Sequence, residues 1–72
     1  GMTFKEYLMR VRVKSAREAV VRTDDSMLEI ALESGFTDSR ALIIAFRAVY
    51  GETPYQYRKK YASANLRNFK DN

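Results

Sequence analysis

Apolar residues recur at intervals of three and four along most of this chain, which is the spacing of one face of an α-helix. The pattern predicts helices over about 4–22, 26–33 and 38–50, and a further helix that begins at Pro54. The run Thr23-Asp24-Asp25 interrupts the pattern and is interpreted as a short joint between two helices. Because the helical period holds nearly throughout, with only one Pro and three Gly, the predicted fold class is all-α.

The middle of the chain carries the signals of two helices joined by a tight turn. Ser26 stands three residues before Glu29, which is the spacing of a capping box. Ser34-Gly35 is expected to end this helix, since Gly adopts a left-handed conformation at little steric cost. Thr37 or Asp38 is expected to cap the next helix. This is the helix-turn-helix plan, which helical hairpins that do not bind DNA also share.

The helix predicted over 4–22 has an apolar and a basic side. Thr3 and Glu6 form a second predicted capping box at its start. One broad apolar stripe is predicted from Phe4, Tyr7, Leu8, Val11, Ala16, Ala19 and Val20. The same segment holds six of the thirteen cations of the chain: Lys5, Arg10, Arg12, Lys14, Arg17 and Arg22. The basic side is interpreted either as a solvated polar face or as a helix that lies along a phosphate backbone.

The helix predicted over 38–50 also divides into two faces. Its buried stripe is predicted from Leu42, Ala45, Phe46 and Val49, and the opposite side from Arg40, Ile43, Ile44 and Arg47. Gly51 is expected to end this helix, and a third capping box starts the next one at Thr53 and Gln56. In that last helix Tyr57 and Tyr61 are expected to face the core.

The composition restricts the chemistry of the chain. Seventy-two residues make one small domain, and the absence of Cys and His removes the commonest metal ligands and the usual general base. We therefore expect no metal, no cofactor and no enzymatic activity, and the acidic residues are interpreted as caps and surface: Asp24, Asp25, Glu29 and Glu33. A net charge of +4 favours an anionic partner, although such a charge is also common in proteins that bind no nucleic acid. No apolar run has the length of a membrane span, so no membrane partner is expected.

Residues at fixed spacing connect this chain to a known family. They are Ile30-Ala31, Gly35-Phe36, Asp38, Phe46-Arg47, Gly51, Thr53-Pro54 and Tyr57-Arg58, with Tyr7-Leu8, Arg12 and Ala16 upstream. This pattern, over residues 1 to about 60, resembles the signature of the AraC/XylS family of bacterial transcription regulators. The resemblance implies a small homeodomain-like helix-turn-helix domain with a long N-terminal linker helix. It also implies a cytoplasmic regulator that binds double-stranded DNA, with the recognition helix at about 38–50 in the major groove.

The resemblance also divides the chain. It implies a linker helix and joint over 1–25, a second helix-turn-helix unit with a closing helix over 26–62, and a polar C-terminal tail over 63–72. The DNA-binding domain of the family carries two such units, and this chain begins where the first one ends. The apolar face of the linker helix is therefore expected to lack a partner. Two residues depart from the family pattern: Ile44 stands where Arg is usual, and Leu42 where Phe is usual.

The predicted DNA contacts come from two elements. Residues near the start of the recognition helix are expected to meet base edges: Ser39, Arg40, Ile43 and Ile44. Arg40 is suited to a bidentate contact with guanine, whereas the two Ile offer only apolar contact, for example with thymine methyl groups. The expected phosphate contacts are Arg47, Arg58 and Lys59. Ordinary surface charge is the alternative interpretation of all the cations, and a packing surface is the alternative for the two Ile.

The second function class that remains open is a protein-interaction or dimerisation module, a degenerate helix-turn-helix that does not read DNA. Exposed Ile43 and Ile44 and the uncovered face of the linker helix both favour it. Self-association through the linker-helix face is then expected, as a symmetric dimer or by exchange of that helix between two chains.

Overall fold

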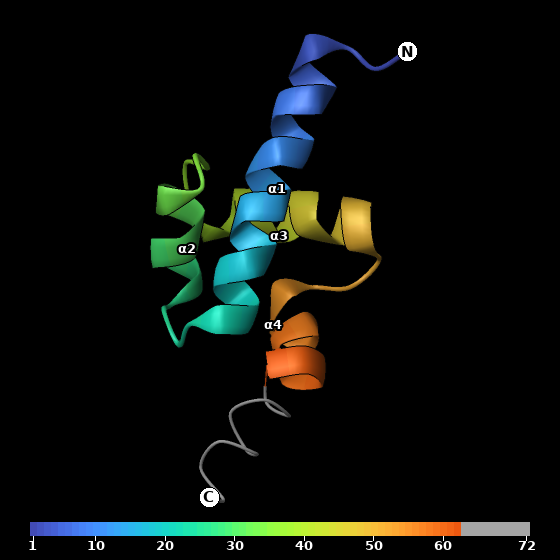
Figure 1. The fold of residues 1–72 in the computed structure, drawn as a ribbon. Helices are drawn as coiled ribbons and strands as arrows, with labels where there is room; N and C mark the ends of the chain where they lie inside the picture. The colour runs from blue at the N-terminus through green and yellow to red at the C-terminus, as the bar shows by residue number, and fades with distance from the viewer. Residues whose placement is uncertain (63–72) are drawn as a thin grey trace, which may run out of the picture.

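The computed structural model describes residues 1–62 and confirms the all-α class (Figure 1). It contains the helices α1 (Phe4–Arg22), α2 (Met27–Glu33), α3 (Ser39–Tyr50) and α4 (Pro54–Tyr57). The chain continues from α4 as a π-helical turn, η1 (Arg58–Ala62), which the sequence did not predict. The predicted tail over 63–72 lies outside the described residues. None of the helices described is long and apolar enough to cross a membrane.

The structure completes one of the three predicted capping boxes. Thr53 Oγ1 accepts a hydrogen bond from the Gln56 amide at 3.2 Å, and Gln56 Oε1 accepts one from the Thr53 amide at 3.0 Å. At the starts of α1 and α2, Thr3 and Ser26 each accept an amide hydrogen bond at 3.1 Å from the residue three positions later. The Ser26 hydroxyl donates to the Glu29 carboxylate at 3.5 Å, so Glu29 contacts the capping side chain. Each helix start is fixed by near neighbours in the sequence.

The turn between α2 and α3 closes on its own backbone. The Gly35 amide donates to the Leu32 carbonyl at 3.2 Å, and the Phe36 amide donates to the Ala31 carbonyl at 2.8 Å. These two bonds form a Schellman motif, which requires a left-handed residue after the helix. Gly35 supplies it with φ of +97°. The helix-turn-helix plan predicted for the middle of the chain is confirmed.

The core is built by α1, α2 and α3 together. Its fully or nearly fully buried side chains are Val13, Ala16, Val20, Met27, Ile30, Ala31, Leu42, Ala45 and Phe46. The predicted buried face of α3 is confirmed, with Val49 partly buried at its edge. α1 therefore contributes three of these side chains, as many as α2 or α3 does.

The predicted apolar stripe of α1 is buried only in its C-terminal half. Ala16 and Val20 are buried as predicted, but the third buried residue is Val13, which the predicted stripe omits. Phe4 is 79% exposed, and Tyr7 and Val11 are exposed as well. Figure 1 shows the physical reason: the first turns of α1 extend above the other helices, which leave most of the surface of these turns uncovered. This exposure agrees with the expectation that part of the linker helix lacks a partner.

Aromatic rings attach the C-terminal segment to α3. The Phe46 ring centroid lies 4.9 Å from that of Tyr50 and 5.3 Å from that of Tyr57. Tyr57 in turn lies 4.5 Å from Tyr61. Tyr57 faces the core as predicted, whereas the prediction for Tyr61 is wrong, since its side chain is exposed. Tyr61 is the last ring of the cluster, and the Lys60 ammonium group lies 5.6 Å from its centroid.

Candidate nucleic-acid interface

The N-terminus of α3 is fixed by Asp38, whose Oδ1 accepts a hydrogen bond from the Ala41 amide at 2.8 Å. Ser39 and Arg40 are therefore the first two residues of the helix. The Ser39 side chain is half-buried and the Arg40 side chain is exposed. In helix-turn-helix proteins the residues at this end of the second helix are those that meet base edges.

The two isoleucines follow one turn later on the same side of α3. Ile43 is half-buried and Ile44 is 64% exposed, and Arg47 is exposed one turn further on. Since Leu42 and Phe46 on the opposite side are fully buried, α3 has one face toward the core and one toward solvent. The structure thus brings the predicted base-contacting residues and Arg47 onto a single face.

A groove of about 440 Å³ lies beside this face, between α3 and the N-terminal half of α1. We call it the α1–α3 groove, and it is lined by Lys5, Leu8, Met9, Arg12, Phe36, Ala41, Ile44, Ala45 and Ala48. Most of these side chains are apolar, and the two that are charged are both cations. Ile44 therefore belongs to the groove wall as well as to the outer face of α3, a position that the sequence did not indicate.

Arg58 has a structural role that sequence reasoning missed. Its Nε donates to the Val20 carbonyl at 3.0 Å, and its Nη2 donates to the Thr23 carbonyl at 3.0 Å. The last carbonyls of a helix lack partners within the helix, and a cation there also favours the negative end of the helix dipole. Arg58 therefore closes the C-terminal end of α1 and holds the C-terminal segment against it. Lys59, by contrast, is exposed.

A second contact between α1 and the C-terminal segment comes from Arg17. Its Nη1 donates to the Tyr57 hydroxyl at 3.5 Å, and its guanidinium lies 6.0 Å from the centroid of the Tyr50 ring. The hydrogen bond with Tyr57 is the main cause that raises the pKa of Arg17 above its ordinary value. Arg17 therefore stays charged and keeps this contact throughout the usual pH range.

Arg12 is a further cation close to the helix-turn-helix turn. A Cβ atom placed on Gly35 would lie 2.9 Å from Arg12 Nε, so the Arg12 side chain passes directly over this glycine. Gly35 is thus required for its positive φ, whereas the exposed and flexible Arg12 side chain could shift to make room for a Cβ atom. The sequence contains no local signal for this contact, because it joins residues more than twenty positions apart.

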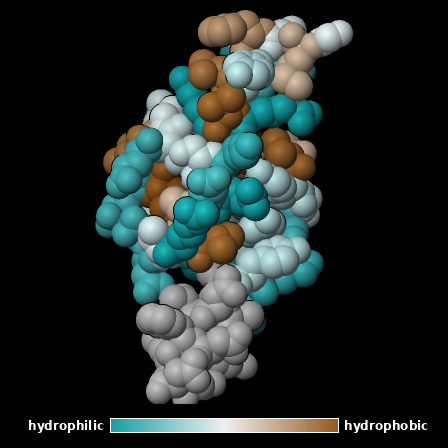
Figure 2. All heavy atoms as spheres, viewed as in Figure 1, coloured by the Kyte–Doolittle hydropathy of each residue, from teal (hydrophilic) through white to brown (hydrophobic). Residues whose placement is uncertain are grey.

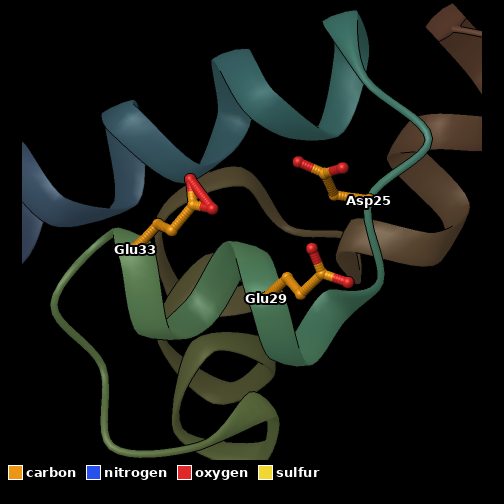
Figure 3. Close-up of side chains that lie close together, drawn as sticks. All are labelled: Asp25, Glu29 and Glu33. Carbon is orange, nitrogen blue, oxygen red and sulfur yellow. The ribbon is translucent and has the colours of Figure 1, made fainter.

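Acidic side chains gather on α2 and on the joint that precedes it. The carboxylates of Asp25, Glu29 and Glu33 come within 4.8 Å of one another (Figure 3). Glu29 and Glu33 are exposed and Asp25 is half-buried. Exposed acidic groups of this kind commonly occur without a metal ion, so the cluster on its own does not define a metal site. It does make the surface at α2 negative, in a chain whose net charge is positive.

The fold and the two-faced α3 define a helix-turn-helix protein, and comparison with known proteins agrees. Residues 1–60 match the family model described as "Helix-turn-helix domain". The melibiose operon regulatory protein of Escherichia coli K12 is 38% identical over 58 residues, which are 81% of this chain and 19% of that protein. The transcriptional activator RhaS of Escherichia fergusonii is 37% identical over 59 residues, 82% of this chain and 21% of that protein.

A third relative extends the comparison beyond the enterobacteria. The Msm operon regulatory protein of Streptococcus mutans is 34% identical over 60 residues, 83% of this chain and 22% of that protein. No solved structure matches the chain. This chain belongs to the AraC/XylS family of helix-turn-helix transcription regulators. It spans about a fifth of the length of these relatives.

Proposed function

We propose that this chain binds double-stranded DNA as part of a bacterial transcription regulator, with α3 in the major groove. The observation that carries the proposal is the division of α3 into a fully buried face and a solvent face that begins with Ser39 and Arg40 at the capped end of the helix. Membership of a family of transcription regulators supports it.

Each side chain on the solvent face has a distinct role in the proposal. Arg40 donates two hydrogen bonds to guanine O6 and N7, and Ser39 bonds a base or a phosphate. Ile43 and Ile44 contact thymine methyl groups, which are the apolar feature of the major groove. Because Ile44 replaces the family's usual Arg, this chain reads fewer hydrogen-bonding positions than a typical unit.

The phosphate contacts are assigned to Arg47 and Lys59, both exposed. For Arg58, two guanidinium donors already bind carbonyl oxygens of α1 and of the joint, so we assign it to holding the fold together. With so few cations available, binding is expected to be weak, largely non-specific and strongly dependent on salt.

Duplex binding tests the proposal. It is measured by fluorescence anisotropy at several salt concentrations, over a panel of duplex sequences. Arg40→Ala is expected to reduce the differences among sequences, at a cost of about 1–3 kcal/mol on guanine-containing sites. Arg47→Ala is expected to weaken all duplexes alike and to lower the salt slope by about 1. Arg22→Ala removes an exposed cation from the last turn of α1 and serves as the charge-matched control.

Identical behaviour of the Arg40 and Arg22 variants would contradict the assignment of base reading to α3. Tight sequence-specific binding by the wild-type chain at physiological salt would contradict the expectation that a single unit binds weakly and largely non-specifically.

A second candidate function is self-association through the N-terminal half of α1. The exposed Phe4, Tyr7 and Val11 favour it, and Figure 2 shows apolar surface in the upper part of the molecule, where Figure 1 places these turns. A symmetric dimer, or exchange of α1 between two chains across the joint Thr23–Asp25, would cover this surface. Sedimentation of the wild type and of Phe4→Gln tests it: a dimer that the substitution dissociates supports the candidate, and a wild-type monomer excludes it.

A further inference from the structure

The α1–α3 groove has the form of a receptor for a helix. Ala41, Ala45 and Ala48 follow one another at helical spacing along its α3 side, and their small side chains allow close approach of another backbone. Leu8, Met9 and Ile44 add apolar walls, and Lys5 and Arg12 supply two positive charges. Neither cation forms an ion pair with any residue in the part of the chain that the structure describes.

The outer face of α2 has the complementary character. Leu28 and Leu32 form an i, i+4 row and are 50% and 54% exposed, so α2 presents two adjacent apolar side chains to solvent. Glu29 and Glu33 lie beside this row and are exposed. Together with Asp25 they form the acidic cluster of Figure 3, in which like charges repel one another and no described cation lies within ion-pair distance. A basic surface brought to this cluster would remove that repulsion.

The two surfaces also match in length. α2 spans seven residues, and Ala41 to Ala48 covers a similar stretch of α3, so each is about 10 Å long at a rise of about 1.5 Å per residue. A row of leucines at i and i+4 fits between the small residues of a facing helix. Within one molecule these surfaces do not meet, since no residue of α2 lines the groove.

We propose that the α1–α3 groove binds the outer face of α2 from a second copy of the chain, with Leu28 and Leu32 in the groove and Glu29 and Glu33 toward Lys5 and Arg12. The contact is heterologous, because the surface that one copy offers differs from the surface that it receives. In a pair, one copy keeps an unused groove and the other keeps an unused α2 face, so association continues head to tail as concentration rises.

Two substitutions each alter one side of this contact and leave the other side intact. Leu32→Gln removes an apolar group from the donor helix, and Ile44→Gln removes one from the groove; both side chains are more than half exposed, so folding is preserved. Each variant is expected to weaken self-association about tenfold or more in sedimentation equilibrium. Val11→Gln, an exposed apolar residue of α1 that does not line the groove, is the matched control and leaves association unchanged. Circular dichroism melts confirm that each variant is folded.

Mixing the two variants gives the decisive measurement. The Ile44→Gln chain keeps an intact α2 face and the Leu32→Gln chain keeps an intact groove, so together they can form one native contact. The expected result is a complex with one copy of each chain that does not grow further, although each variant alone is monomeric. A symmetric groove-to-groove dimer would not be rescued by mixing, and that result would overturn the proposal.

The charged groups provide an independent test. Glu33→Lys and Lys5→Glu are each expected to weaken association, and the mixture of the two is expected to restore it. A wild-type chain that stays monomeric in sedimentation equilibrium, at every concentration measured, would overturn the proposal. Loss of association in the Val11→Gln control would overturn it as well, because the exposed N-terminal turns of α1 would then carry the contact.

Discussion

The two halves of α1 differ more than their sequences suggest. Both carry apolar and basic residues at helical spacing. In the C-terminal half, Val13, Ala16 and Val20 are completely buried, and Arg58 binds the carbonyls at its end. In the N-terminal half Phe4 and Val11 are exposed. The difference teaches that apolar periodicity establishes a helix, whereas burial depends on whether another element is present on that side.

The same substitution at two phenylalanines would test this difference most strongly. Phe46→Ala is expected to cost about 3–5 kcal/mol, because it removes a fully buried ring that contacts two tyrosines. That loss is comparable with the whole stability of a small domain. Phe4→Ala, at a largely exposed position, is expected to change stability by less than about 0.5 kcal/mol. Urea denaturation of both variants measures the difference, and equal losses would contradict the unequal support of the two halves.

Replacing Arg58 would remove part of what stabilises the C-terminal half of α1. Arg58→Ala is expected to cost about 1–2 kcal/mol, because two carbonyl oxygens lose a charged donor in a partly buried position. Arg58→Lys is expected to recover little of this, since an ammonium group lacks the planar fork that reaches both oxygens. Thermal melts of both variants, compared with Arg47→Ala as an exposed control, provide the measurement. If Arg58→Ala melts like the wild type but loses DNA affinity, Arg58 is a phosphate contact after all.

The smallest expected effect concerns the start of α1. Thr3→Ala removes the hydrogen bond to the Glu6 amide, yet it is expected to lower global stability by less than about 0.5 kcal/mol. The reason is that the first turns open without disturbing the core, so their cap contributes mainly to local order. Amide hydrogen exchange is expected to be fast over the first two turns of the wild type and faster still in the variant. Slow exchange there would show that another surface covers these turns.

The features that sequence reasoning found are those determined by near neighbours. Asp38 caps α3 through a residue three positions away, and Gly35 closes the turn through its own neighbours. The two faces of α3 follow in the same way from the helical period, since α3 packs on its neighbours along most of its length. The AraC/XylS signature was found because it consists largely of such positions.

The features that sequence reasoning missed depend on contacts between distant segments. Val11 and Val13 are both valines on α1, two positions apart. Only the position of α2 and α3 decides that Val13 is the buried one. Arg58 reaches carbonyls 35 and 38 residues earlier in the chain, which no local pattern encodes. Which side chains in fact contact DNA stays a prediction, since burial and exposure define a face but not its ligand.

Ile44 stands at once in the outer face of α3 and in the wall of the α1–α3 groove. One side chain cannot be covered by a thymine methyl group and by a leucine of another copy at the same time. The proposed DNA binding and the proposed self-association therefore compete for the same free molecules. As the protein becomes more abundant, a growing share of its copies is held by other copies, and occupancy of DNA rises less steeply than total concentration. Conversely, excess duplex dissolves the assemblies, so the chain would buffer its own activity without any added ligand.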